Sequence, residues 1–89
     1  MNSRTLNAAL RVEQDREAAA RLIRSVRSRR VRLGISQQTL AGVAGCSLAT
    51  IRDIEAGPPS LAMARRVDDA LADLEAAAAS AVRASAPSR

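Results

Sequence analysis

The stretch SQQTLAGVAGCSLATIRDIEAG, residues 36–57, decides the fold because it holds two short segments with helix signals at both ends. Ser36 and Ser47 precede the segments, where a serine side chain accepts a hydrogen bond from a free N–H group of the first helical turn. Gly45 and Gly57 follow them, where glycine adopts the left-handed conformation that ends many helices. The stretch therefore predicts two helices, each with a start signal and a stop signal.

The two predicted helices span residues 37–44 and 48–56. Only Cys46 and Ser47 lie between Gly45 and the second helix, so the corner is tight and the helices must cross steeply. At helical spacing the apolar side chains of each helix share one face, which is expected to be buried. These inner-face residues are Leu40, Ala41 and Ala44 in the first helix and Ile51 and Ile54 in the second.

This pair of helices resembles the helix-turn-helix of the lambda-repressor and Cro family, which includes small xenobiotic-response-element-type transcriptional regulators. The residues that carry the resemblance are Ser36-Gln37, Leu40-Ala41, Ala44-Gly45, Ser47, Thr50-Ile51, Ile54-Glu55 and Gly57, with Arg30-Val31-Arg32-Leu33-Gly34 similar to the end of the family's first helix. The resemblance covers residues 21–72. It implies an all-α fold, a compact four-to-five-helix lambda-repressor-like DNA-binding domain, here with extended N- and C-terminal helices. The family's usual fifth helix with its aromatic residue is missing.

Length and composition favour one small binding domain. The chain has 89 residues, no histidine, no aromatic residue and one cysteine, Cys46. It therefore lacks the commonest general base and most metal-ligand sets, and we expect no enzyme, no cofactor and no metal site. No apolar stretch is long enough to cross a bilayer and no signal-peptide pattern is present, so the sequence predicts a cytoplasmic protein.

Positive charge is concentrated in the N-terminal part of the chain. Residues 1–57 hold ten arginines against five acidic residues, whereas residues 58–89 hold four of each. The whole net charge of +5 thus lies in residues 1–57, the part of the chain that contains the predicted helix-turn-helix. A basic surface beside such a motif is typical of a protein that binds nucleic acid phosphates.

The rest of the chain is expected to be helical around this motif. Nothing between Asn2 and Leu33 breaks a helix, so the N-terminal extension is predicted either to run straight into the domain's first helix or to bend near Asp15. The expected organisation is an N-terminal helical extension at 1–20, the DNA-binding domain at 21–74 with its helix-turn-helix at 37–56, a continuation of the last helix at 75–84 and a disordered tail at 85–89.

Arg30 is the exception on an otherwise apolar face. Leu22, Val26 and Leu33 share that face at helical spacing, and a guanidinium group there needs a carboxylate partner. The resemblance supplies Glu55, because the family's matching arginine pairs with its matching glutamate. The alternative is an arginine whose charged end reaches out to water.

The candidate site residues follow from the resemblance and from helical spacing. In a helix-turn-helix the second helix enters the major groove. Arg52 is expected to bind guanine or, failing that, a phosphate, and Asp53 to accept from cytosine N4. The predicted base contacts are Leu48, Ala49, Thr50, Arg52 and Asp53, and the predicted phosphate contacts are Gln37, Gln38, Ser47, Arg27, Arg29 and Arg32. Leu48 and Ala49 can contact only apolar groups such as the thymine methyl.

The sequence thus predicts a regulator of transcription, a repressor that binds double-stranded DNA as a homodimer at a palindromic operator. The predicted dimer contacts are Leu6, Leu10, Leu74, Ala78, Ala81 and Val82. Leu6 and Leu10 are expected to pack on the 74–82 stripe, either within one subunit or across the two-fold axis. Two alternatives remain at this stage: an antitoxin whose terminal helix masks a small protein partner, and a protein-interaction adaptor that has lost DNA binding.

Overall fold

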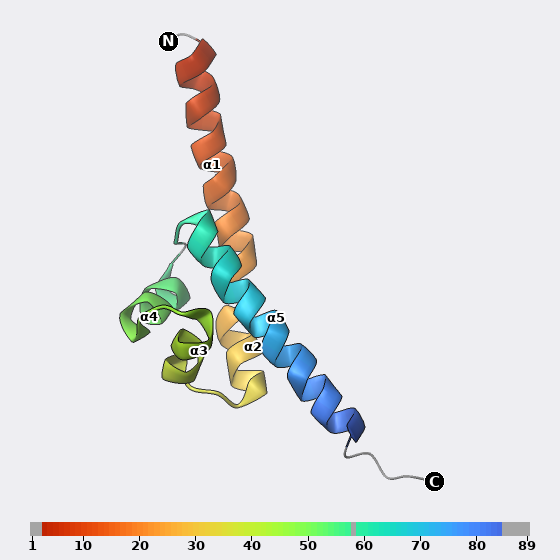
Figure 1. The fold of residues 1–89 in the computed structure, drawn as a ribbon. Helices are drawn as coiled ribbons and strands as arrows, with labels where there is room; N and C mark the ends of the chain where they lie inside the picture. The colour runs from red at the N-terminus through yellow and green to blue at the C-terminus, as the bar shows by residue number, and fades with distance from the viewer. Residues whose placement is uncertain (1–2, 58, 85–89) are drawn as a thin grey trace.

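The structure, a computed structural model, describes residues 3–57 and 59–84. Within these residues it contains helices and no strand, so the prediction of an all-α fold is confirmed. The predicted tail at 85–89 lies outside the described residues. The helices are α1 (Ser3–Ile23), α2 (Val26–Leu33), α3 (Gln37–Ala44), α4 (Leu48–Ala56) and α5 (Leu61–Ala84), and Figure 1 shows their arrangement.

Both helices of the predicted motif have the predicted bounds, because local hydrogen bonds define their N-terminal ends. The Ser36 hydroxyl accepts from the Thr39 backbone N–H at 3.0 Å, and the Ser47 hydroxyl accepts from the Thr50 N–H at 3.1 Å. α3 ends at Gly45, whose φ of 70° is left-handed as predicted. Each cap satisfies a backbone donor that the first helical turn leaves free.

The predicted left-handed end of α4 is wrong. Gly57 has φ −176° and ψ 168°, which is extended backbone. The next residue in the sequence is proline, and the ring of a proline pushes the preceding residue into the extended region. The chain therefore leaves α4 in an extended conformation on its way to α5.

One apolar core joins α2, α3, α4 and the first part of α5. The predicted inner faces of α3 and α4 are buried in it, together with Val26 from α2. Leu74 and Cys46 are partly buried against the same cluster. The buried members are Val26, Leu40, Ala41, Ala44, Ile51, Ile54, Val67, Ala70 and Leu71. This core fixes α3 against α5 and α4 against α3.

The N-terminal helix stops at Arg24 and Ser25, so both predicted arrangements, a straight rod and a bend near Asp15, are wrong. Ser25 has φ −106° and ψ 6° and makes no side-chain cap. Neither residue is a recognisable stop signal, and the break coincides with a change of packing partner. Ala19 on α1 is buried where α1 lies against α5, whereas Val26 on α2 is buried in the helix-turn-helix core.

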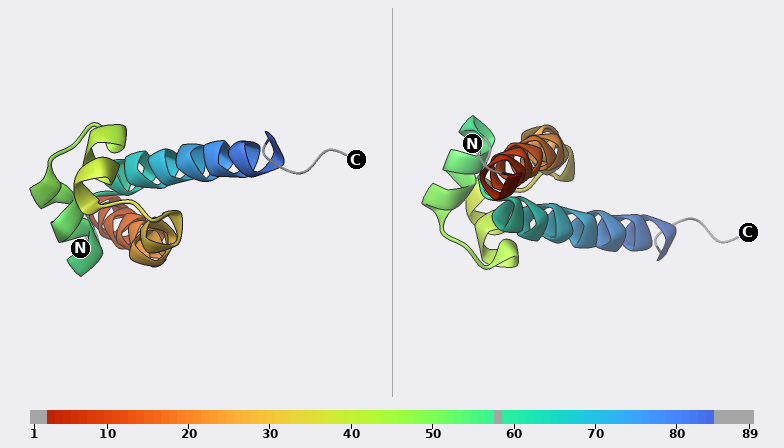
Figure 2. Two further views of the ribbon diagram at one scale, coloured as in Figure 1. Left: turned by 90° about the horizontal axis from the view of Figure 1, so that it is seen from below. Right: turned by 90° about the horizontal axis from the view of Figure 1, so that it is seen from above.

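α1 and α5 run in the same direction but are staggered, so each projects past the core at one end (Figures 1 and 2). The chain measures 68 × 29 × 19 Å, and its radius of gyration of 16.8 Å exceeds the value of about 12 Å for a compact domain of this length. The N-terminal part of α1, which includes Leu6 and Leu10, lies at the opposite end of the molecule from the C-terminal part of α5, which includes the 74–82 stripe (Figure 1). The predicted packing of these residues on one another within a subunit is therefore wrong.

Arg29 ties α2 to α5. Its Nη1 lies 2.7 Å from Asp68 Oδ1, and its Nη2 lies 2.6 Å from Glu75 Oε1. The hydrogen bond to Arg29 lowers the pKa of Glu75, and the same bond raises the pKa of Arg29. The two carboxylates lie two turns apart on α5. A single guanidinium group on α2 therefore fixes two turns of α5 against α2.

Arg29→Ala is expected to lower the unfolding free energy by about 1–2 kcal/mol, because charge-assisted hydrogen bonds are lost at a largely covered site. Thermal unfolding followed by circular dichroism measures this loss. The pKa of Glu75 is depressed in the folded state, so the contribution of the pair is present above the ordinary glutamate pKa and disappears as pH falls through the lower, folded value. An equal effect of the substitution at neutral pH and well below the glutamate range would contradict this assignment.

Candidate nucleic-acid interface

The exposed side of α4 is the candidate reading surface. Ile51 and Ile54 are fully buried, so the helix turns the other side outward. Ala49, Arg52 and Asp53 are exposed on this outward side, and Leu48 is half-buried. The structure therefore brings together four of the five predicted base-contacting side chains at an accessible surface.

Thr50, the fifth, is engaged within the protein. Its hydroxyl lies 2.8 Å from the Ser47 hydroxyl, which also accepts from the Thr50 backbone N–H at 3.1 Å. The predicted phosphate contact Ser47 is likewise the N-cap of α4. These two hydroxyl groups form the start of the reading helix, and this local role accounts for both residues.

Arg30 and Glu55 lie together as the resemblance implied. Arg30 Nε is 2.8 Å from Glu55 Oε2 and its Nη2 is 3.1 Å from Oε1, with the two side chains only 14% and 7% exposed. The hydrogen bond to Glu55 raises the pKa of Arg30. Arg30 also donates to the Ile35 carbonyl at 3.0 Å, and Gln37 Nε2 donates to Glu55 Oε1 at 3.4 Å. Sequence reasoning missed these last two bonds, for which the local pattern carries no signal.

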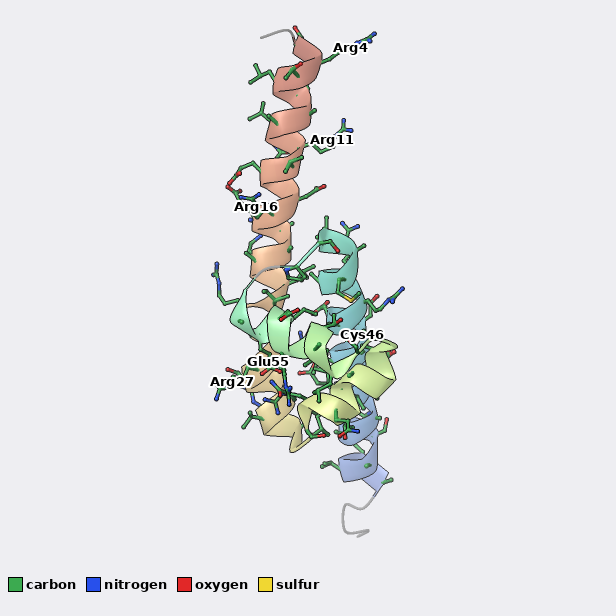
Figure 3. All side chains as sticks on the ribbon, turned by 90° about the vertical axis from the view of Figure 1, so that its left-hand side faces the viewer. Arg4, Arg11, Arg16, Arg27, Cys46 and Glu55 are labelled. Carbon is green, nitrogen blue, oxygen red and sulfur yellow. The ribbon has the colours of Figure 1, made fainter. Side chains whose placement is uncertain are left out.

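A basic cleft of about 460 Å³ lies between α2, α3 and α4. Three arginines and one glutamate line it, and the glutamate is already paired with Arg30. Arg27 and Arg52 are exposed, and among the described residues no ion pair holds either of them. Figure 3 shows Arg27 and Glu55 on the same side of the helix-turn-helix. The lining residues are Arg27, Arg30, Gln37, Arg52, Glu55 and Ala56.

The other predicted phosphate contacts do not line this basic cleft. Gln38 and Arg32 are exposed, and Arg32 is close enough to α5 for its charge to lower the pKa of Glu75. Arg29 is not among the residues that line the basic cleft. Its guanidinium is held by Asp68 and Glu75 and is 17% exposed, so its prediction as a phosphate contact is corrected to an interhelical ion pair.

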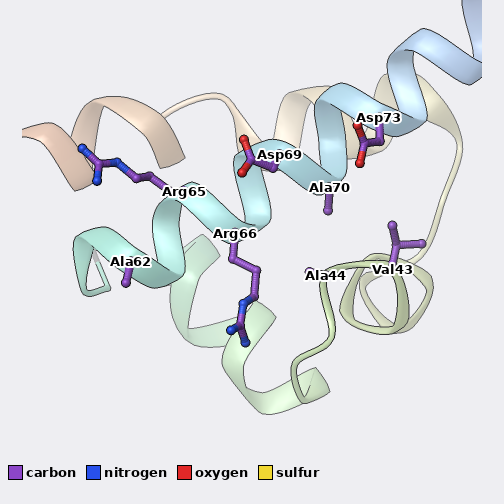
Figure 4. A pocket seen from close by; sticks show the side chains of 8 residues that line it. All are labelled: Val43, Ala44, Ala62, Arg65, Arg66, Asp69, Ala70 and Asp73. Carbon is purple, nitrogen blue, oxygen red and sulfur yellow. The ribbon is translucent and has the colours of Figure 1, made fainter.

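A second cleft lies between α3 and α5, and Figure 4 shows its lining side chains. Arg65 and Arg66 are balanced there by Asp69 and Asp73, so this cleft has no net charge. The cleft beside Arg27 and Arg52 has two unbalanced arginines. Of the two clefts, only the basic one has the electrostatics of a phosphate site.

Comparison with protein families agrees with this geometry. A helix-turn-helix family model, of the Cro/C1 type, matches residues 26–74, which include α2, α3, α4 and the first half of α5. The chain belongs to this family of DNA-binding transcription regulators. No curated protein and no solved structure matches the chain. Among the described residues, no helix is both long enough and apolar enough to span a membrane.

Proposed function

We propose that this protein is a repressor that binds a specific double-stranded DNA operator as a homodimer. The observation that carries the proposal is the position of the outward side of α4 next to the cleft of Arg27 and Arg52. The N-terminal half of α4 enters the major groove while the cleft meets the adjacent phosphates. Repression requires only that the operator be occupied, which a small domain of this kind can do.

Phosphate binding is assigned to three side chains that line the basic cleft. Gln37 is the first residue of α3, where free N–H groups and the helix dipole favour an anion. Arg27 and Arg52 add two positive charges, and within residues 3–57 and 59–84 neither forms an ion pair with a carboxylate. The sequence favoured guanine as the partner of Arg52, but its place beside Arg27 and Gln37 supports a phosphate contact.

Arg27→Ala and Arg52→Ala are each expected to weaken binding to every DNA sequence by a similar factor. Each loses one phosphate contact, so the slope of log affinity against log salt should fall by about one unit. Fluorescence anisotropy titrations at several salt concentrations, with an operator duplex and a random duplex, measure both quantities. A loss confined to the operator would instead make Arg52 a base-reading residue.

Selection of bound sequences from a random DNA pool tests the proposed function as a whole. The expected product is a palindrome, which reports binding, two-fold symmetry and half-site spacing in one experiment. Half-sites should stand about 34–36 Å apart centre to centre, or at a multiple of that distance. If no sequence is enriched, the DNA-binding assignment fails and an adaptor role replaces it.

The proposed dimer uses the projecting ends of α1 and α5. Leu6, Leu10 and Val12 on α1 are 50%, 51% and 58% exposed, and Val82 on α5 is 71% exposed. Ala78 and Ala81 are exposed on the same projecting part of α5. The chain exposes 6372 Å², against about 5,000 Å² for a compact protein of 9.4 kDa, and a stable interface takes about 800 Å² from each partner. The excess surface is sufficient for such an interface.

Leu74 offers this interface only the part of its side chain that the core leaves exposed. It is partly buried and packs against the core of its own subunit. Of the remaining predicted contacts, Leu6 and Leu10 belong to the N-terminal part of α1, and Ala78, Ala81 and Val82 belong to the C-terminal part of α5. These two helix ends lie at opposite ends of the molecule (Figure 1). They can therefore meet only between two copies of the chain.

A further inference from the structure

The structure leaves very few side chains on α4 with which to read bases. Thr50 is bonded to Ser47, and Arg52 lines the phosphate cleft. Leu48, Ala49 and Asp53 remain, and Leu48 is half-buried. Ala49 and Asp53 are both exposed and lie one helical turn apart on the same side of the helix. We propose that Ala49 and Asp53 together read the major-groove edge of a cytosine, and that they prefer cytosine that carries a C5 methyl group. This inference rests on the proposed DNA binding.

Asp53 selects the base through its charge. Its carboxylate is exposed, and among the described residues no arginine pairs with it. An ionised carboxylate only accepts hydrogen bonds, and phosphates repel it, so it requires a donor that stands clear of acceptors. In the major groove cytosine presents the N4 amino group alone, whereas adenine adds the N7 acceptor and guanine and thymine present acceptors at the same edge. Cytosine is therefore the base that fits Asp53 best.

Ala49 supplies the apolar half of the site. C5 is bonded to the ring carbon that carries N4, and Ala49 lies one helical turn from Asp53 on the same side of α4, so the proposal sets Ala49 against the C5 position when Asp53 accepts from N4. Ala49 offers a methyl group there and no polar atom. Its small size leaves space for a second methyl group on the base. A methyl group at C5 of the base would thus leave water and pack against the Ala49 methyl group.

The two residues together predict an order of affinity. 5-Methylcytosine satisfies both Asp53 and Ala49, cytosine satisfies Asp53 only, and thymine has the methyl group but turns its O4 acceptor toward the carboxylate. Thymine should therefore bind more weakly than either form of cytosine. This order separates the proposed site from a simple apolar contact with the thymine methyl, which would rank thymine above unmodified cytosine.

The test uses the full chain and an operator from the random-pool selection, with one half-site cytosine at a time replaced by 5-methylcytosine, or its C·G pair replaced by T·A so that the duplex stays fully paired. At the cytosine that faces Asp53, 5-methylcytosine should bind about fourfold tighter, the effect of burying one methyl-sized group. Thymine should bind about tenfold or more weaker, within the range for a wrong base at a hydrogen-bonded position. Anisotropy titrations at fixed salt give each ratio.

Two substitutions assign the effects to residues. Asp53→Asn should bring cytosine and thymine close to equal affinity, because an amide can either accept from N4 or donate to O4. Ala49→Gly should remove the higher affinity for 5-methylcytosine. A double-mutant cycle that combines this substitution with removal of the base methyl group should therefore show that the two methyl groups interact. Glycine lowers helix stability, so the glycine variant could lose affinity for that reason alone. Ala49→Ser keeps a side chain at this position and serves as the control, and circular dichroism measures the helix content of both variants.

The outcomes separate this inference from the proposed function. If an operator is selected but no cytosine in it depends on Asp53, or 5-methylcytosine binds no tighter than cytosine, the inference is overturned while the DNA-binding function stands. If no operator is selected, the proposed function fails and takes the inference with it. Arg27→Ala is the matched control, since it should lower the affinity for the cytosine, 5-methylcytosine and thymine duplexes by the same factor.

Discussion

Glu55→Ala is expected to leave a large part of the protein unfolded at room temperature. The substitution strands Arg30, whose side chain is only 14% exposed, without its carboxylate partner. Breaking one side of a buried ion pair costs about 3–5 kcal/mol, and a domain of this size has a total stability of about 5 kcal/mol. Thermal unfolding followed by circular dichroism measures the loss directly. A melting temperature equal to that of the wild type would show that the pair contributes nothing to stability.

Two controls isolate the cause of that loss. The double variant Arg30→Met/Glu55→Leu should recover most of the stability, because no unpaired charge remains in the core. Arg27→Ala changes an exposed arginine of the same helix and should stay within about 0.5 kcal/mol of the wild type. Equal melting of the single and double variants would assign the effect to lost packing instead of the stranded charge.

A chain that starts at Gln14 is expected to fold, to sediment as a monomer and to lose operator affinity by about a thousandfold or more. The truncation removes Leu6, Leu10 and Val12 but keeps Ala19, the buried residue of α1 where it lies against α5. A single reading helix meets few base pairs, so a monomer should fall toward the level of non-specific binding. Sedimentation equilibrium and anisotropy titration give the two quantities.

The truncation also removes Arg4 and Arg11, which project from α1 in Figure 3. The double variant Arg4→Ala/Arg11→Ala in the full chain therefore serves as the charge control and should remain a dimer. The variant Leu6→Asp/Leu10→Asp should reproduce the truncation without shortening the chain. If the truncated chain remains dimeric and binds its operator normally, the N-terminal helix is not the dimer contact.

The bounds of the two helices of the motif could be predicted because their signals are local, although the conformation of Gly57 could not. Ser36 and Ser47 cap the helices that they precede, and the apolar spacing between them identifies the buried faces. The break at Arg24 and Ser25 could not be predicted, since no residue there favours it and packing against α5 determines where it falls.

The roles of the arginines show the same limit. Arg30 was assigned through the resemblance, which includes its partner Glu55. Arg29 belongs to a run of arginines in the sequence, and nothing in that run distinguishes it from Arg27 or Arg32. Its carboxylate partners are about forty residues away on α5, so only the folded chain identifies it as an interhelical tie.

Glu55 accepts from Arg30 of α2 and from Gln37 of α3 while it is itself part of α4, so one carboxylate links three helices. The orientation of the reading helix relative to the phosphate-facing end of α3 is therefore set before DNA arrives. A binding surface that is already ordered loses little conformational entropy on association. The protein should accordingly approach its operator as a rigid body, and electrostatic attraction to the phosphates should speed its association with any DNA. Most of the difference in affinity between DNA sequences should then lie in the rate of dissociation.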